Sequence, residues 1–422
     1  MAKIVKVTSQ EILDSRGNPT VQTSVYLDNG YGATAGVPSG GSVGRYEACE
    51  LRDNDPKRFN GLGVLKAVAN VNSVIAPKII GLDSANQTKI DQVMIDLDGT
   101  IDKSRLGANA ILSVSIAAIK ASAAACRLPL YEYLFKKYNL VKNLNQIPCP
   151  TFNIINGGAH GAGNLDFQEF HLIPSSRFKY SQALQTGVTV YKNLKSVLTQ
   201  RQAIHSVGDE GGYAPNLFTN LDALEVMTEA IKLSNLKLGQ DVFLGLDTAS
   251  RWFYKNCSYQ IKDRAQPFSR EELIAYFLEL NHEYHLFSME DPLDYDDWQG
   301  WTKLTEEMGN VSLIVGDDLV ATNKERVKKA VSLKACNAIL VKPNQIGTVS
   351  ETVAVIKYCR DNHWKIIVSH RSGETNDPFI ADLAVGLGAD YTKFGAPARG
   401  ERIAKYNRLL EIETELKAHA GK

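Results

Sequence analysis

The chain has no excess of charge of either sign. Its 422 residues include 47 Lys and Arg and 47 Asp and Glu, so the formal net charge is zero. Proteins that bind nucleic acid or anionic membranes through general attraction usually carry a basic surplus. No charge block or low-complexity tract supplies such a surplus here. The composition therefore gives no indication of a nucleic-acid partner, and any cationic patch must be local.

The chain also lacks paired cysteine motifs and an obvious secretion signal. None of its six cysteines forms a CxxC spacing, which is typical of reduced, structural thiols in the cytosol. Residues 1–5 run directly into an alternating strand pattern, so we expect no signal peptide and a cytoplasmic location. The most apolar stretch, residues 108–126, contains Asn109 and Lys120 among many Ala and Ser residues. This composition predicts a tightly packed soluble helix rather than a membrane span.

The length is sufficient for two or three domains. Residues 3–37 have the pattern of three antiparallel strands, with a hairpin turn at residues 28–30. Residues 56–137 have helical periodicity, and strands followed by helices predict an α+β unit. The predicted division is an N-terminal domain at 1–138, a linker at 139–150 and a second domain at 151–422.

The region from Gly245 to Lys393 repeats one pattern six times. Each repeat is a short apolar run that ends on a charged or polar residue, and these end residues are Asp247, Glu290, Asp317, Lys342, His370 and Lys393. A (β/α)8 barrel uses about 30 residues for each strand and helix, and the spacings from Glu290 onward are close to this length. Buried parallel strands are unbroken apolar runs, and the helices between them are amphipathic. The second domain is therefore predicted to be such a barrel.

Residues that follow barrel strands point into the mouth of the barrel, where these folds carry their chemistry. Three carboxylates, two lysines and a histidine should therefore converge on one small volume. Three ionised carboxylates require a compensating cation, and ligands that are all oxygen suit Mg2+. The alternative is that each charged residue only caps its strand at the solvated rim.

Three glycine-rich segments add possible site residues. The segment 38–44 contains three glycines and could cradle a phosphate, although it is not a P-loop because no Gly-Lys-Ser/Thr follows. Residues 153–161 form a strand that opens into a loop with His160, and residues 207–212 place Asp209 and Glu210 between glycines. The alternatives are a plain flexible connection for the first segment and tight turns with solvated acids for the other two.

Taken together, these motifs resemble the enolase family over nearly the whole chain. The matching segments are 14–20 (DSRGNPT), 38–44, 106–112 (LGANAIL), 156–160 (NGGAH), 168–170 (QEF), 208–212 (GDEGG), 290–292 (EDP), 316–319 (GDDL), 342–348 (KPNQIGT) and 369–375 (SHRSGET). The resemblance implies an α+β N-terminal domain followed by a ββαα(βα)6 barrel. It also implies a homodimer, or an octamer of such chains.

The activity that the resemblance implies is the reversible dehydration of 2-phospho-D-glycerate to phosphoenolpyruvate, with two Mg2+ ions per active site. An enolate intermediate needs such a cation, and enolase-superfamily enzymes combine it with a Lys or His base. The implied metal ligands are Asp247, Glu290 and Asp317 for the first ion and Ser42 for the second. The implied catalytic groups are Lys342 as base, kept neutral by nearby cations, and Glu210 as acid. The implied substrate-binding residues are His160, Gln168, Glu169, Glu290, Asp317, His370, Arg371, Ser372 and Lys393.

Some positions depart from the family pattern. Gly41 and Val43 replace the usual Ala and Thr, Arg251-Trp252 replaces a usual Glu-containing pair, and Phe394 replaces Thr.

Two other functions are alternatives to the enolase reaction. A superfamily member that acts on a non-phosphorylated carboxylate would leave the phosphate-binding groups unpaired. A surface or secreted fraction that binds plasminogen is suggested only by the terminal Lys422.

Overall fold

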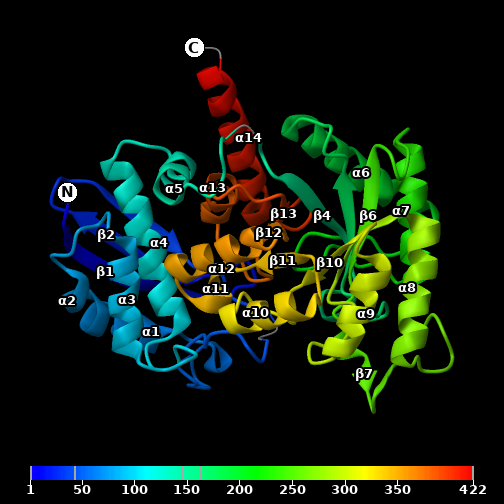
Figure 1. Ribbon diagram of the computed structural model, residues 1–422, viewed down its shortest axis with the longest axis horizontal. Helices are drawn as coiled ribbons and strands as arrows, with labels where there is room; N and C mark the ends of the chain where they lie inside the picture. Colours follow the sequence, from blue (N-terminus) through cyan, green and yellow to red (C-terminus); the bar gives the residue numbers. More distant parts are fainter. Residues whose placement is uncertain (1, 42–43, 145, 162, 421–422) are drawn as a thin grey trace.

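The computed structural model describes residues 2–41, 44–144, 146–161 and 163–420. Ser42, Val43 and Lys422, which carry three of the expectations above, lie outside the described residues. Figure 1 shows two lobes: an N-terminal lobe in blue and cyan, and a barrel lobe in green to red from which helix α14 projects with the C-terminus.

The N-terminal lobe is a three-stranded antiparallel meander covered by helices. Strand β1 (Ile4–Leu13) pairs with β2 (Pro19–Leu27), and β2 pairs with β3 (Gly32–Gly36). The helices are α1 (Leu65–Asn70), a π-helical turn (Val71–Ile75), α2 (Ala76–Ile79), α3 (Gln87–Asp98), α4 (Ala108–Ala125) and α5 (Leu130–Tyr138). The meander and the helices confirm the predicted α+β unit.

Helix α4 is long and apolar enough to cross a membrane, but it is the core helix of this lobe. It packs against β2 and β3, and 83% of its residues are buried inside the protein. Its Ala and Ser side chains allow close approach of these neighbours. The helix is thus tightly packed, as its composition predicted.

The second lobe is a closed eight-stranded barrel. Its strands in chain order are β4 (Cys149–Asn156), β5 (Glu169–Pro174), β6 (Val242–Asp247), β9 (Leu286–Glu290), β10 (Leu313–Gly316), β11 (Ala338–Val341), β12 (Lys365–Ser369) and β13 (Tyr391–Lys393). Strand β5 is antiparallel to both β4 and β6, and the other neighbours are parallel.

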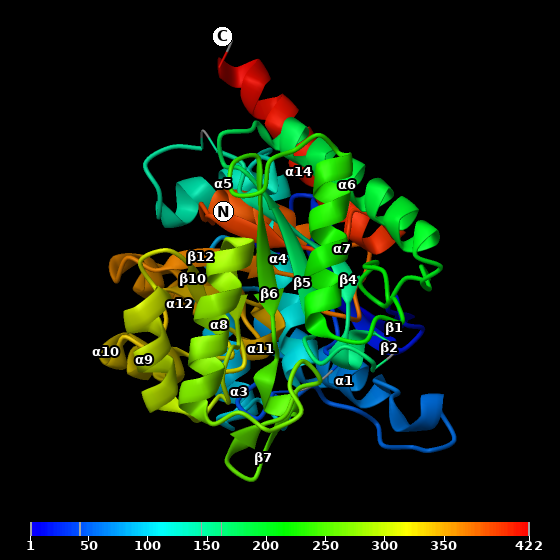
Figure 2. The same cartoon turned by 90° about the vertical axis from the view of Figure 1, so that its right-hand side faces the viewer.

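Two helices, α6 (Tyr180–Gln200) and α7 (Asn220–Leu233), follow the first two strands. Helices α8 (Arg270–Tyr284), α9 (Trp298–Met308), α10 (Lys324–Leu333), α12 (Val349–Asp361), α13 (Phe379–Gly386) and α14 (Gly400–Ala420) then each follow one strand. A small hairpin, β7 (Tyr254–Lys255) with β8 (Ser258–Tyr259), and the short α11 (Pro343–Ile346) are insertions. This order confirms the ββαα(βα)6 barrel, and Figure 2 shows helices α6, α7 and α8 outside its strands.

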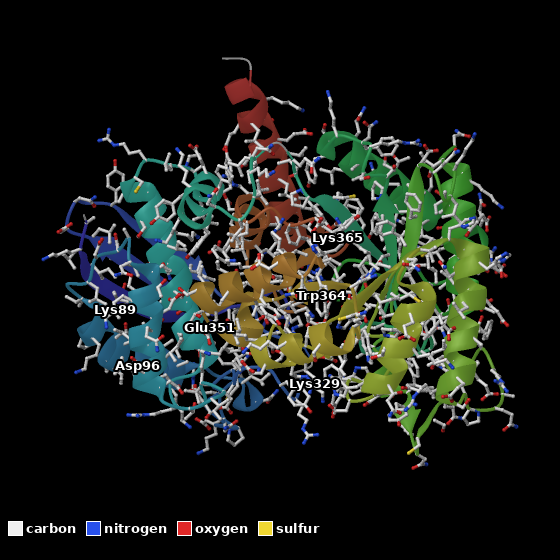
Figure 3. The ribbon with its side chains drawn as sticks, viewed as in Figure 1. Lys89, Asp96, Lys329, Glu351, Trp364 and Lys365 are labelled. Atoms are coloured by element: carbon white, nitrogen blue, oxygen red, sulfur yellow. The ribbon has the colours of Figure 1, made fainter. Side chains whose placement is uncertain are left out.

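The N-terminal lobe packs against α11 and α12 of the barrel through α3 and α4. Lys103 Nζ donates to Glu351 at 3.1 Å across this contact, and Figure 3 shows Glu351 on α12 beside the cyan helices. Ser39 and Gly373 exchange two backbone hydrogen bonds, of 2.7 and 3.0 Å. The glycine-rich segment that begins at Pro38 is therefore attached to the loop that follows β12.

Candidate active site

The six residues that end the apolar runs meet at one end of the barrel. Asp247, Glu290 and Lys393 are the last residues of their strands, and Asp317, Lys342 and His370 directly follow theirs. Five of the six are buried and Lys342 is partly buried. All except Glu290 line a single pocket. The Glu290 carboxylate accepts a hydrogen bond from Lys393, which lines that pocket. Solvated caps at the rim are thus excluded.

Strand β5 supplies a further carboxylate because it runs in the opposite direction. Its first residue, Glu169, pairs in register with Asp247, the last residue of β6. The N-terminal end of β5 therefore lies at the same face as the C-terminal ends of its neighbours. Gln168, immediately before it, donates through Nε2 to Asp247 Oδ2 at 3.3 Å, and its buried Oε1 has no hydrogen-bond partner among the described residues.

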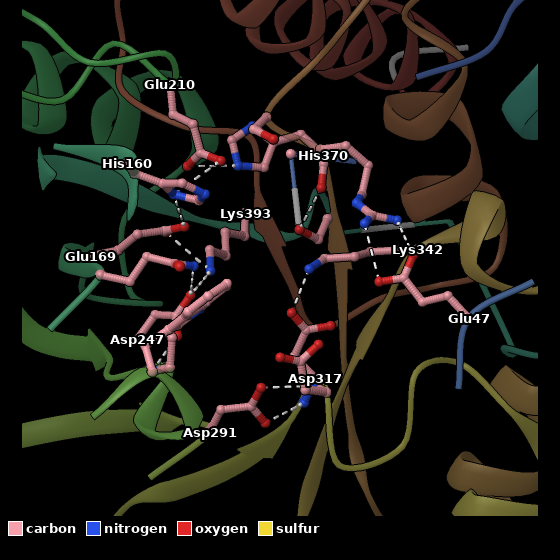
Figure 4. Close-up of a pocket in the computed structure, with 18 residues that line it drawn as sticks. Glu47, His160, Glu169, Glu210, Asp247, Asp291, Asp317, Lys342, His370 and Lys393 are labelled. Atoms are coloured by element: carbon pink, nitrogen blue, oxygen red, sulfur yellow. Dashed lines mark hydrogen bonds and ion pairs between the residues drawn. The ribbon is translucent and has the colours of Figure 1, made fainter. Parts of the chain in front are cut away.

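Lys393 is the centre of the acidic part of the pocket (Figure 4). Its Nζ lies 3.1 Å from Asp247 Oδ2, 2.8 Å from Glu290 Oε2 and 3.0 Å from Glu169 Oε2. Burial lowers the pKa of Lys393, but the surrounding carboxylates raise it by more, so the pKa lies well above its ordinary value. Lys393 is therefore a fixed cation.

Lys342 does not have the low pKa expected of a base that is held neutral. Its Nζ forms an ion pair with Asp317 Oδ2. Burial lowers the pKa of Lys342, but Asp317 raises it by more, and the net pKa is above its ordinary value. Among the protein groups alone, the repulsion from Arg371 and Lys393 is weaker than the attraction to Asp317. The neutral Lys342 expected beside Lys393 and bound metal ions stays a prediction.

Glu210 stands between two histidines on the other side of the pocket from Lys342 (Figure 4). His160 Nδ1 lies 3.5 Å from Glu210 Oε1, and His370 Nε2 lies 3.3 Å from Oε2. Asn153 Nδ2 also donates to Oε2, at 2.9 Å. Burial raises the pKa of Glu210, but the two histidines lower it by more, to about 2. Glu210 is therefore ionised here and must gain a proton before it can act as an acid.

The pKa values of the two histidines are shifted in opposite directions. Burial lowers the pKa of His160, but the carboxylates of Glu210 and Glu169 raise it by more, so the pKa is above its ordinary value. Burial and the adjacent Arg402 lower the pKa of His370. Arg402 Nη1 donates to His370 Nδ1 at 2.7 Å. Since a guanidinium can only donate, the proton of a neutral His370 is on Nε2, directed at Glu210.

Arg402 is a site residue that no motif or spacing in the sequence singled out. It lies in the first turn of α14, is fully buried, and also donates to the carbonyls of Asp209, Arg371 and Ser372. In the sequence, nothing distinguishes this arginine from the exposed charged residues that are common near the start of a helix. Only the folded structure shows that it joins the Glu210 loop to the loop after β12.

Arg371 and Ser372 line the edge of the pocket closest to the N-terminal lobe. Both Nη atoms of Arg371 donate to the carboxylate of Glu47, at 2.8 and 3.1 Å. Gly41 packs closely against Ser372: a Cβ at position 41 would lie 2.4 Å from Ser372 Oγ and 2.8 Å from Arg16 Nη1. Gly41 therefore permits a close approach of the loop.

Besides Gly41, two described departures from the family pattern fall in different places. Arg251 Nε pairs with Asp318 Oδ2 at 3.1 Å, and its guanidinium lies 4.8 Å from the ring of Trp252, which lines the pocket. Phe394 is fully buried and packs against Tyr406, with ring centroids 5.9 Å apart. The first departure is thus at the pocket, and the second is in the hydrophobic core.

The carboxylates of the site suit a divalent cation. Three of them, those of Asp291, Asp317 and Asp318, have oxygens within 4.8 Å of one another. Burial together with Asp318 and Asp317 raises the pKa of Asp291 well above its ordinary value. Burial and Asp247 do the same for Glu290. The lysines and arginines therefore do not neutralise this set fully, and hard oxygen ligands favour an ion such as Mg2+.

A closed barrel with an α+β lobe at its mouth, and a pocket there that combines buried acids with two lysines, is the arrangement of a barrel enzyme whose side chains suit proton transfer. Comparison with known families agrees. Residues 4–134 match the family described as "Enolase, N-terminal domain", and residues 144–421 match "Enolase, C-terminal TIM barrel domain". The chain belongs to the enolase family and is a lyase of the enolase superfamily.

Proposed function

We propose that the protein catalyses the Mg2+-dependent, reversible dehydration of 2-phospho-D-glycerate to phosphoenolpyruvate. The observation that carries the proposal is the placement of Lys342 and Glu210 on different sides of one pocket, with a buried arginine at its edge. An amine on one side and a carboxyl group on the other allow proton removal at C2 and protonation of the departing C3 hydroxyl.

The anionic substrate explains the two fixed cations. Lys393 would bind the carboxylate of the substrate, and Arg371 with Ser372 would bind its phosphate. Guanidinium groups suit the bidentate recognition of phosphate. A substrate without phosphate would make no use of the buried Arg371 that lines the pocket, which disfavours the superfamily alternative.

Two divalent cations would complete the site. Asp247, Glu290 and Asp317 would hold the first, and Ser42 with the substrate phosphate would hold the second. Bound there, Mg2+ would act as a Lewis acid that stabilises negative charge on the substrate carboxylate. Lys342 must lose a proton to solvent and leave its ion pair with Asp317 before its neutral Nζ can accept the C2 proton. A cation held by the Asp317 carboxylate would weaken that ion pair and lower the pKa of Lys342, which would favour both changes.

The acid half of the reaction would use the His160–Glu210 pair. His160 has the raised pKa and lies 3.5 Å from Glu210, so a proton held at its Nδ1 can pass to Glu210 Oε1. Glu210 would then donate this proton to the C3 oxygen, which leaves as water. His370, fixed by Arg402, would hold the Glu210 carboxylate in place.

The test is the ultraviolet absorbance of the enol phosphate product after 2-phosphoglycerate is added with Mg2+, and again with EDTA. We expect product formation that EDTA stops, that Lys342→Ala abolishes, and that Lys365→Ala leaves unchanged. Lys365 is the matched control, since it is exposed at the opposite end of β12 (Figure 3). A wild-type protein that forms no product with Mg2+ would contradict the proposal.

We further propose a cytoplasmic location and a homodimer, or an octamer of such chains, because these are the expectations for the enolase family. Light scattering of the purified protein measures the assembly, and a monomer at working concentration would contradict it.

A further inference from the structure

The glycine-rich segment 38–44 is held at both ends by the part of the barrel that carries Arg371. At its start, Ser39 and Gly373 exchange backbone hydrogen bonds. The approach is close, since a Cβ on Gly373 would lie 2.8 Å from the Ser39 carbonyl oxygen and 2.2 Å from Asp14 Oδ2. The start of the segment is therefore fixed relative to the loop after β12.

At the other end, one carboxylate joins the segment to the arginine. Glu47 Oε1 accepts from the backbone N–H of Gly44 at 2.9 Å and from Arg371 Nη2 at 3.1 Å, and Oε2 accepts from Arg371 Nη1 at 2.8 Å. The Glu47 and Arg371 side chains are each 5% exposed. Buried, bidentate pairs of this kind fix the plane of the guanidinium. Asn344 Oδ1 accepts from the same Nη1 at 2.9 Å.

Tyr46, next to Glu47 in the chain, packs against three residues of the barrel lobe, Arg326, Tyr295 and Asp296, and these contacts are called the Tyr46 clasp. The guanidinium of Arg326 lies 3.6 Å from the centre of the Tyr46 ring, and the ring of Tyr295 meets it edge-on at 5.9 Å. The Tyr46 hydroxyl donates to Asp296 at 3.1 Å. Cation–π contacts of this type are attractive at exposed sites and stronger where water is excluded. Residues 46 and 47 thus engage the barrel on its outer surface and in its pocket, respectively.

We propose that Glu47 is a positioning residue for the phosphate-binding Arg371, and that the Tyr46 clasp holds Glu47 in place. Docking of Tyr46 on the outside of the barrel then sets the affinity of the pocket for phosphate. The inference rests on the proposed function for the identity of the substrate, although phosphate binding can be measured without turnover.

The opposite role for Glu47 is that of a competitor that occupies Arg371 until phosphate displaces it. The two roles predict effects of opposite sign. Removing a positioning residue weakens phosphate binding, because the guanidinium loses its fixed orientation. Removing a competitor strengthens binding, because the arginine is released.

The experiment compares Glu47→Gln, Tyr46→Ala and the double variant with the wild type. It measures KM and kcat for 2-phosphoglycerate and the dissociation constant of inorganic phosphate by calorimetry. Glutamine retains the shape of Glu47 but loses the bidentate, charged acceptor. We expect KM and the phosphate constant to rise about tenfold in Glu47→Gln, roughly the loss of one charge-assisted hydrogen bond, with kcat within about twofold.

The double variant tests whether the effect of the clasp passes through Glu47. Tyr46→Ala should weaken phosphate binding several-fold in the wild type and no further in the Glu47→Gln background. Lys329→Gln is the matched control, because Lys329 is on α10 with Arg326 and lies 4.3 Å from the ring of Trp298 (Figure 3). This control should match the wild type.

Tighter phosphate binding by Glu47→Gln would overturn the proposal in favour of the competitor. Additive effects in the double variant, or unchanged phosphate binding in both single variants, would also overturn it. Thermal melting and circular dichroism confirm that each variant is folded. A wild type that binds phosphate but does not dehydrate 2-phosphoglycerate would refute the proposed function and leave the Glu47 comparison intact.

Discussion

Asp91 should make the contact between the two lobes sensitive to pH. It is 1% exposed on α3 and accepts hydrogen bonds from Ser115 Oγ at 2.7 Å, Gln87 Nε2 at 3.0 Å and the backbone N–H of Ser350, in the first turn of α12, at 2.9 Å. These donors are neutral, so they compensate only partly for burial. Burial raises the pKa of Asp91 from 3.8 to about 6.

The sign of the effect follows from the two states of the protein. Below pH about 3, Asp91 is protonated whether the chain is folded or unfolded. Between pH about 4 and 6 the unfolded chain releases the proton while the folded protein keeps it, so stability falls as pH rises through this window. The total loss is about 3 kcal/mol, which is the free energy that corresponds to a pKa raised from 3.8 to about 6.

The Asp91→Asn variant isolates this contribution, because asparagine stays neutral. We expect the free energy of unfolding of the wild type, relative to the variant, to fall by about 2 kcal/mol between pH 4 and pH 7, which is most of the total. Urea unfolding followed by tryptophan fluorescence measures it. The amide also alters the bond to Ser350, but that change does not depend on pH, so the slope is diagnostic.

The matched control is Asp96→Asn, since Asp96 is exposed on the same helix (Figure 3). Its profile should run parallel to that of the wild type. A constant difference between the wild type and Asp91→Asn from pH 4 to pH 7 would refute the reasoning, because it would show that Asp91 titrates as it does in the unfolded chain.

Three further changes test the site. Gly41→Ala should raise KM about tenfold or more in steady-state kinetics, because the added Cβ would lie 2.4 Å from Ser372 Oγ; an unchanged KM would show that the loop adjusts. Lys393→Met leaves buried carboxylates unpaired, so unfolding should cost about 3–5 kcal/mol less, and Mg2+ should restore part of the loss in a thermal-shift assay; equal melting with the wild type would contradict this. Arg402→Lys should lower kcat about a hundredfold, because it frees His370 Nδ1, and a kcat close to that of the wild type would rule out the role of Arg402.

The strands that end on charged residues could be predicted because two local signals coincide. Residues 338–341 are apolar throughout, and Lys342 follows them. Residues 313–316 are likewise apolar, and Asp317 follows them. Strands buried on both faces must be apolar, and the first polar residue marks the point where the strand reaches the mouth. The pattern therefore predicted both the element and the place of its last side chain.

The reversed strand β5 shows the limit of that pattern. Glu169 stands at the beginning of its strand rather than at the end, so a search for runs that end on a charge does not find it. Its place in the site depends on strand direction, which is a property of pairing with β4 and β6. The role of Glu169 was expected only from the resemblance to the enolase family.

Pairings between distant residues could not be predicted either. Glu47 and Arg371 are 324 residues apart, and Arg402 and His370 come from different βα units. Each residue alone is an ordinary charged side chain, and only its burial shows that it needs a partner. The same holds for the protonation state of Lys342, which depends on how close Asp317 lies compared with Arg371 and Lys393.

These long-range pairs explain why the pocket requires both lobes. The barrel supplies the acids, the lysines and Arg371, but the two Nη atoms of Arg371 are oriented by Glu47 of the N-terminal lobe. Burial lowers the pKa of Arg371 and Glu47 raises it more than Asp317 of the barrel does, so a buried guanidinium without the Glu47 carboxylate would be poorly compensated. The N-terminal lobe therefore acts as part of the anion-binding site as well as a cover for it.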